Sequence, residues 1–158
     1  MFRVLFVCTG NICRSPTAEG VMRALVEDRG HAARIEIDSA GIGGWHVGEP
    51  PDERSQETAR RRGIEIGTQR ARTVRPGDFD YFDLIIAMDG GHYRSLAGAC
   101  PDGRHDRIRM FMDYAPDYGI EDVPDPYYGA GDGFERVFDM IEAGAAAILA
   151  EIEADHLD

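Results

Sequence analysis

Short apolar runs alternate with segments of helical periodicity along this chain, and that alternation constrains its fold more than any other feature. The runs are rich in β-branched and aromatic residues, which indicates buried strands. Strands are predicted at Arg3–Cys8, from Ile35 up to a closing Ser39–Gly41, at Leu84–Met88 and at Ile108–Phe111. Helices are predicted from Ser15 to a stop at Gly30, from Asp52 to Arg62, from a cap at Asp89 to about Ala97, and after a capping box at Asp132–Glu135. We therefore expect one α/β domain over residues 1–158, a three-layer fold with a small, about four-stranded parallel twisted sheet and helices on both faces.

Composition excludes several classes of function. The chain has 158 residues, 43% of them hydrophobic, which suits one domain with a real core. All 17 basic residues are arginine, so Schiff-base chemistry and the lysine-bearing phosphate loop of common NTPases are excluded. The net charge of −12 argues against binding to nucleic acid or to an anionic membrane. That charge is uneven, because residues 1–76 sum to +2 and residues 77–158 to −14.

The cysteines and the apolar runs predict a cytoplasmic protein without cofactor or metal. The runs Val4–Cys8 and Ala145–Ala150 are too short for a secretory signal or a membrane span. Three cysteines (Cys8, Cys13 and Cys100) are an odd set and form no disulfide framework, which favours a reducing compartment. No Cys-x-x-Cys occurs, and the five histidines lack ligand spacing.

The loop between the first strand and the first helix is the strongest candidate site. Cys8 ends the strand, Gly10 and Asn11 permit a tight turn, and Ser15 begins the helix. Backbone N–H groups and the positive end of the helix dipole make such a loop an anion site, and they favour the thiolate form of Cys8. The planar fork of Arg14 suits two oxygens of a phosphoryl group. A cysteine at a strand end is usually a small buried hydrophobe, but this electropositive setting favours a nucleophile.

A second candidate segment covers residues 113–133, which are rich in Pro, Gly, Asp and Tyr and long for a compact domain. Such loops are usually functional. Two glycine-rich stretches, at 41–46 and 129–133, do not fit the dinucleotide-binding fingerprint, because the first lacks its last glycine and the second follows a loop rather than a strand.

The stretch Val4–Glu19 resembles the signature of the low-molecular-weight protein tyrosine phosphatases. Further matches follow in the family's order over nearly the whole chain. They are Asp38–Gly41, Trp45–Gly48, Arg70–Arg72, Met88-Asp89 and Asp125–Gly129.

This resemblance implies an enzyme that hydrolyses phosphotyrosine in proteins through a cysteinyl-phosphate intermediate. Cys8 would be the nucleophile, Arg14 the phosphate clamp, and Asp125 the general acid and then the base. The residues implied to contact the substrate are Thr9, Gly10, Asn11, Ile12, Cys13, Trp45, Tyr127 and Tyr128. The residues implied to hold the loop by hydrogen bonds are Asn11, Ser15 and Ser39. The oligomeric state is left open, with a monomer favoured.

Several roles keep an alternative. Asp125 before a proline is also a common turn residue, and the two tyrosines after it also suit loop packing or phosphorylation. Cys13 is either a partner that traps oxidised Cys8 as a disulfide or a thiol that only packs. The sequence departs from the family at Gln69, where many members carry a histidine, so a titratable partner of the loop is lost.

Two other functions compete with this interpretation. Thioredoxin-coupled arsenate reductases share the opening loop, but they need two further cysteines close together after the third strand, where this chain has only Cys100. A phosphotyrosine-binding module without chemistry is disfavoured, because nucleophile, clamp and acid are all present. Turnover of an aryl phosphate discriminates both from a phosphatase.

Overall fold

The computed structural model describes residues 1–128 and 132–157, apart from the side chain of Tyr128. Its strands are β1 (Phe2–Cys8), β2 (Ile35–Gly41), β3 (Leu84–Ala87) and β4 (Ile108–Met110). Its helices are α1 (Arg14–Asp28), α2 (Glu53–Arg61), α3 (Asp78–Tyr81), α4 (Gly90–Ala99) and α5 (Gly133–Asp155). Short 3-10 turns are η1 (His105–Arg107), η2 (Phe111–Tyr114), η3 (Pro116–Tyr118) and η4 (Pro126–Tyr128).

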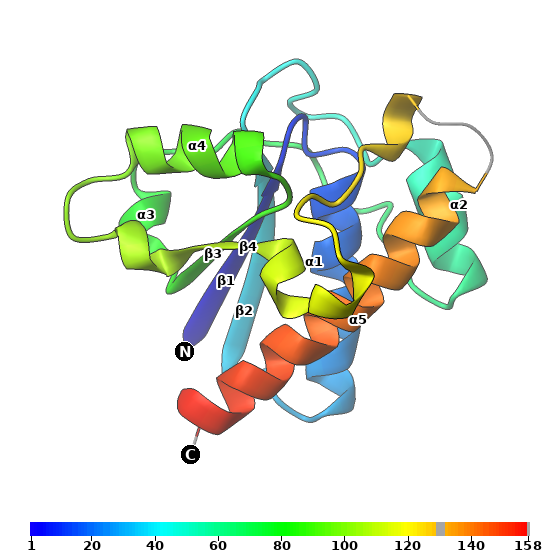
Figure 1. Cartoon of the computed structure of the whole chain (residues 1–158). Coiled ribbons are helices and arrows are strands. Elements are labelled where there is room, and N and C mark those ends of the chain that lie inside the picture. Colours follow the sequence, from blue (N-terminus) through cyan, green and yellow to red (C-terminus); the bar gives the residue numbers. More distant parts are fainter. Residues whose placement is uncertain (129–131, 158) are drawn as a thin grey trace.

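The strands form one parallel sheet in the order β2-β1-β3-β4. Helices α1, α2 and α5 lie on one side of it, and α3 and α4 lie on the other (Figure 1). The predicted three-layer α/β fold is therefore confirmed. Because the chain passes from β1 to β2 on one side and then returns to β3 on the other, the loops after β1 and β3 diverge at the same edge, which is where ligands bind in such sheets.

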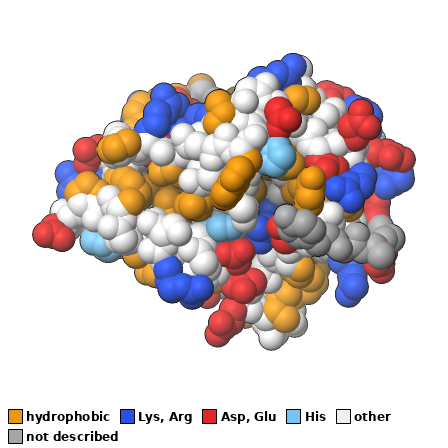
Figure 2. Space-filling model, turned by 90° about the horizontal axis from the view of Figure 1, so that it is seen from above, with side chains coloured by type: hydrophobic (Ala, Val, Ile, Leu, Met, Phe, Trp, Pro, Cys, Tyr) orange, Lys and Arg blue, Asp and Glu red, His pale blue; other side chains and the backbone are white. Residues whose placement is uncertain are grey.

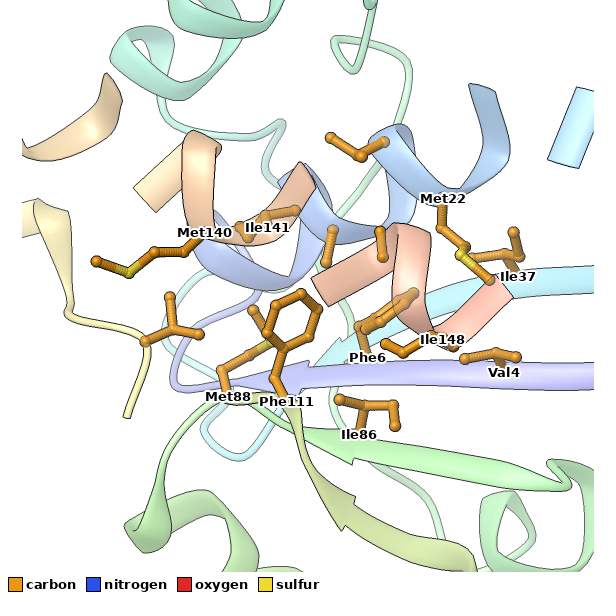
Figure 3. Close-up of a cluster of buried hydrophobic side chains, with 14 of the residues drawn as sticks. Val4, Phe6, Met22, Ile37, Ile86, Met88, Phe111, Met140, Ile141 and Ile148 are labelled. Atoms are coloured by element: carbon orange, nitrogen blue, oxygen red, sulfur yellow. The ribbon is translucent and has the colours of Figure 1, made fainter. Parts of the chain in front are cut away.

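The two faces of the sheet carry two separate hydrophobic clusters, because successive side chains of a strand point to opposite faces. Phe6 of β1 packs with α1 and α5, whereas its neighbours Leu5 and Val7 pack with α3 and α4. Figure 3 shows the first cluster, in which Phe6 lies near Phe111 and near Ile148 of α5. Burial of apolar surface on both faces holds the carboxyl ends of the strands in place.

Four local predictions concern helix starts. The predicted cap at Asp89 is confirmed, since it accepts from the His92 N–H. The helix predicted from Asp52 begins at Glu53, and Asp52 is its cap, which accepts from the Arg54 N–H. The prediction that Ser15 caps α1 is wrong, because the helix begins at Arg14 and the Ser15 side chain is buried against Cys8. Asp132 makes no cap hydrogen bond either, and it forms an ion pair with Arg136 instead.

The segment predicted to be a structureless loop has local order in its described part. It holds η2, η3 and η4, and Val123 within it is fully buried and donates its N–H to the carbonyl of Met88. This bond fixes the segment at the carboxyl ends of the strands. Asp125 and the loop after β1 therefore line the same cavity. In the part of the chain that the structure describes, no helix is long and apolar enough to cross a membrane.

Candidate active site

The loop from Cys8 to Arg14 has one residue in a left-handed conformation and lies in close contact with neighbouring segments. Asn11 adopts a left-handed conformation, with φ of 59°, and asparagine tolerates this better than most residues. A side chain at Gly10 would come within 2.8 Å of the His46 ring. At Gly41 a Cβ would approach the backbone of Thr9 and of Gly10 to 3.0 Å. A side chain at Gly41 would press on backbone, whereas one at Gly10 would require the His46 ring to move.

The Cys8 thiol ends a buried chain of hydrogen bonds. Its Sγ lies 3.0 Å from Ser15 Oγ, and Cys8 is only 2% exposed. Asn11 Nδ2 donates to Ser15 Oγ at 2.8 Å and to Ser39 Oγ at 2.9 Å. The Ser15 hydroxyl accepts from Asn11 and lies beside both the Cys8 sulfur and the Ala40 carbonyl, to which it donates at 3.4 Å. The three residues expected to hold the loop are therefore brought together as predicted.

Glu19 extends this chain and was missed by the sequence analysis. Ser39 Oγ donates to Glu19 Oε1 at 2.7 Å. Burial raises the pKa of Glu19, although the bond from Ser39 and the charge of Arg23 act against that rise. Gln69 stands outside the chain, because its Nε2 donates to the carbonyl of Pro16. Glu19 is therefore a titratable partner of the loop. The sequence feature that could have identified it is its place on the buried face of α1.

The Arg14 guanidinium is buried and held on several sides. Its Nη1 donates to Asp89 Oδ2 at 3.0 Å and to the carbonyl of Val123 at 2.9 Å, and its Nη2 donates to Thr9 Oγ1 at 3.1 Å. Burial alone would raise the pKa of Asp89, but the hydrogen bond from the His92 N–H and the positive field of Arg14 lower it overall. Asp89 therefore stays ionised and fixes the orientation of the guanidinium fork.

His92 contacts Thr9 and Asp89, two of the residues that hold Arg14, and the sequence analysis did not identify it. Its Nε2 lies 2.8 Å from Thr9 Oγ1, the atom that accepts from Arg14, and its Nδ1 lies 3.2 Å from Asp89 Oδ1. Burial, followed by the charge of Arg14, lowers the pKa of His92 to about 4. The imidazole is therefore neutral at physiological pH. Its position three residues after the capping Asp89, at the carboxyl edge of β3, was the available signal.

A cavity of about 310 Å³ opens above this loop. Asp125 lines it too, and its Oδ2 lies 3.5 Å from Arg14 Nη2, within ion-pair distance. The Asp125 Oδ1 accepts the N–H of Tyr127 at 3.0 Å. The cavity thus brings together a sulfur, a guanidinium and a carboxylate. It is lined by Cys8, Thr9, Gly10, Ile12, Cys13, Arg14, Trp45, His46, Asp125 and Tyr127.

Most residues predicted to contact the substrate line this cavity, and His46 joins them unpredicted. The side chain of Asn11 does not line it, because it turns inward to the two serines. Trp45 is 74% exposed and Tyr127 is 39% exposed, so both rings lie at the rim of the cavity. The Tyr128 side chain, also predicted here, lies outside the described residues, as does Gly129.

The other two cysteines differ sharply in position. Cys13 lines the cavity, and burial, with the charge of Asp52 adding to it, raises its pKa to about 12. Cys13 is therefore a protonated thiol, and a disulfide with Cys8 stays a prediction. Cys100 packs in the second hydrophobic cluster beside α4, away from the cavity lining. All three are free thiols.

The cavity opens on the face seen in Figure 2, which looks down on the carboxyl ends of the strands. Hydrophobic side chains run across the middle of this face, and acidic and basic side chains lie mainly toward its edges. Among the residues that the structure describes, no group of three or more His, Cys, Asp or Glu side chains is placed to hold a metal ion.

Comparison with known proteins supports the resemblance seen in the sequence. The family model described as "Low molecular weight phosphotyrosine protein phosphatase" matches residues 3–157. The low molecular weight protein-tyrosine-phosphatase YfkJ of Bacillus subtilis is 46% identical over 155 residues, which is 98% of each chain.

Solved structures agree over the whole fold. A protein tyrosine phosphatase from Entamoeba histolytica, crystallised with Hepes in its active site, superposes with a TM-score of 0.94 at 36% identity, covering 98% of both chains. A Drosophila arginine phosphatase superposes with a TM-score of 0.88 at 31% identity, covering 96% of this chain and 98% of its own. The sequence, the fold and the loop around Cys8 therefore lead to one conclusion: the chain belongs to the low molecular weight phosphotyrosine protein phosphatases, a family of hydrolytic enzymes.

Proposed function

We propose that this chain, as one phosphatase domain, hydrolyses phosphotyrosine in proteins, and aryl phosphate monoesters generally, through a phosphocysteine. The observation that carries the proposal is that Cys8, Arg14 and Asp125 line one cavity, with Asp125 within ion-pair distance of Arg14. A thiolate attacks phosphorus in line with the leaving oxygen, so nucleophile and acid must lie on opposite sides of the phosphoryl group. A phosphoryl group bound in this cavity between the Cys8 sulfur and the Asp125 carboxyl would meet that requirement.

The first half of the reaction forms the phosphocysteine. Cys8 Sγ, stabilised by the Ser15 hydroxyl, attacks phosphorus as the bond to the phenolic oxygen breaks. The loop N–H groups and the Arg14 fork hold the three phosphoryl oxygens, whose negative charge they balance in the transition state. Asp125 donates its proton to the departing phenolate, which leaves as a neutral phenol.

The second half regenerates the thiolate. Asp125, now a carboxylate, removes a proton from a water molecule as the water oxygen attacks phosphorus. The bond between sulfur and phosphorus breaks, and Cys8 leaves as a thiolate while inorganic phosphate is released. No metal or cofactor enters either half, because the cationic grip is supplied by Arg14 and the loop amides.

The rim of the cavity supports an aromatic substrate. Ile12 presents an apolar surface beside the loop, and the rings of Trp45 and Tyr127 flank the opening. Such walls suit the face of a phenol ring. The arginine phosphatase among the structural relatives makes phosphoarginine a second substrate to test, but a cationic guanidinium gains less from these apolar walls than a phenol does.

The proposal is tested by two substitutions and a control. Cys8→Ser is expected to abolish hydrolysis of phosphotyrosine, although the variant protein should still bind phosphate. Asp125→Asn is expected to slow this hydrolysis by about 10²–10⁴-fold. Cys100→Ser is the matched control, because that thiol packs away from the cavity, and its activity should stay unchanged. Full activity in Cys8→Ser, or faster cleavage of phosphoarginine than of phosphotyrosine, would contradict the proposal.

The proposal also includes a location and a partner. A cytoplasmic location is supported by the three free thiols, which suit a reducing compartment. A phosphotyrosine protein as partner follows from the family. The arsenate reductase alternative is disfavoured, because Cys100 packs in the core beside α4 and does not reach the cavity as a relay would require.

A further inference from the structure

Arg54, in the first turn of α2, is held in one orientation by its neighbour Asp52. Its Nε and Nη2 donate to the two carboxylate oxygens of Asp52, each at 3.0 Å, and its backbone N–H donates to Asp52 Oδ1 at 2.8 Å. The side chain is 48% exposed, so this pair adds little to stability by itself. A forked, two-point contact on a helix cap does, however, fix where the guanidinium lies.

The guanidinium reaches the loop that carries Asp125. Its carbon lies 5.3 Å from the centre of the Tyr127 ring and 4.8 Å from that of the Phe134 ring, and Nη1 donates to the Tyr127 carbonyl at 3.4 Å. Tyr127 in turn donates its N–H to Asp125 Oδ1 at 3.0 Å. Arg54 therefore holds the residue whose backbone orients the candidate general acid.

The other end of this connection lies in the loop that carries Cys8. The backbone N–H of Asp52 donates to the carbonyl of Ile12 at 2.8 Å. Asp52 and Arg54 are thus bonded to each other and contact both loops that the reaction needs. Ile12 lies on the side of the phosphate, and Tyr127 lies on the side of the acid.

We propose that Arg54 is a positioning residue for proton transfer, which sets the distance from Asp125 to the leaving oxygen by tying the acid loop to the phosphate loop. The proposal rests on the function proposed above. Arg54 does not line the cavity, so it acts through Tyr127. Loss of this tie weakens protonation of the leaving group and leaves the phosphate grip of Arg14 intact. Lysine at this position keeps the charge but not the two-point contact with Asp52.

The test compares kcat/KM over a series of substituted phenyl phosphates, because this parameter reports formation of the phosphocysteine. For Arg54→Ala we expect a fall of about 10-fold with phenyl phosphate, from the loss of one cation–π contact and one hydrogen bond. With p-nitrophenyl phosphate, whose phenolate leaves without help, we expect less than about 2-fold. Inhibition by orthovanadate is expected to be unchanged, and Arg54→Lys is expected to resemble Arg54→Ala.

Arg60→Ala is the matched control. It removes the same charge from the same helix, but Arg60 contacts Glu65 and Gln56 and not the acid loop. An equal fall for all leaving groups, a matching loss of vanadate binding, or the same pattern in Arg60→Ala would overturn the role of Arg54. If the unaltered protein hydrolyses no aryl phosphate, the proposed function fails instead, so the two failures are distinguishable.

Discussion

Replacement of His92 by glutamine tests the electrostatics of the clamp. His92 is 5% exposed, and the charged groups that act on it are Arg14, Asp89, Asp122 and Asp125. Burial, followed by the positive charge of Arg14, lowers its pKa. The folded protein therefore holds a neutral imidazole, whereas the unfolded chain binds a proton at the ordinary pKa. Glutamine does not titrate, and its amide is long enough to keep a hydrogen bond to the hydroxyl that His92 contacts.

The size of the effect follows from the pKa of His92, which falls from 6.5 to about 4 on folding. A group with a depressed folded pKa contributes stability above its unfolded pKa and loses that contribution as the pH falls toward the folded value. Between pH 7.5 and pH 5 the unfolded chain takes up the proton and the folded protein does not. This difference lowers the free energy of unfolding by about 2 kcal/mol at pH 5, at about 1.4 kcal/mol for each tenfold difference in proton affinity.

The assay is urea unfolding of the original protein and of His92→Gln at pH 7.5 and pH 5. The original protein should lose about 2 kcal/mol more than the variant over this interval, since all other titrating groups are shared. Activity toward p-nitrophenyl phosphate at each pH confirms that the folded state is the active one. If both proteins lose the same free energy, His92 does not titrate as its burial implies, and the account of the clamp is wrong.

Two further substitutions test packing and the buried chain of hydrogen bonds. In Gly144→Ala the added Cβ of α5 would lie 2.3 Å from a ring atom of the fully buried Phe111, so overpacking should outweigh the roughly 1 kcal/mol gained in helix propensity. We expect the melting temperature to fall by about 3–6 °C, and an unchanged or higher value would contradict this. Glu19→Gln keeps an acceptor for Ser39 and removes a carboxylate whose pKa is raised by burial. The original protein should lose stability relative to this variant as the pH rises from 4.5 through the raised pKa, and parallel pH profiles in urea unfolding would show that Glu19 is not a desolvated acid.

The parts of the site predicted from sequence are those set by neighbours along the chain. The turn from Cys8 to Arg14 depends on Gly10, Asn11 and the start of a helix, and all of these lie within seven positions. The cap at Asp89 was predicted for the same reason. At Ser15 the local rule failed, because burial against Cys8 uses the side chain that would have capped the helix.

The residues missed are those whose role comes from contacts between distant segments. His92 meets Thr9, Arg54 meets the loop of Asp125, and Glu19 meets Ser39, and each looks like an ordinary helix residue in the sequence. Their chemistry depends on burial and on neighbouring charge, which a linear pattern does not contain. The placement of Asp125 beside Arg14 likewise depends on the tertiary structure.

The sequence by itself determined the alternation of strands and helices, the loop that bears the proposed nucleophile, and the absence of lysine, which leaves arginine as the cation available to grip a phosphate. These features are local or compositional, so a linear chain displays them directly. Only the tertiary structure decided how Arg14 is held, which acid extends the chain of hydrogen bonds, and what ties the two loops together. The physical reason is that packing creates the low-dielectric surroundings and fixed distances on which those interactions depend.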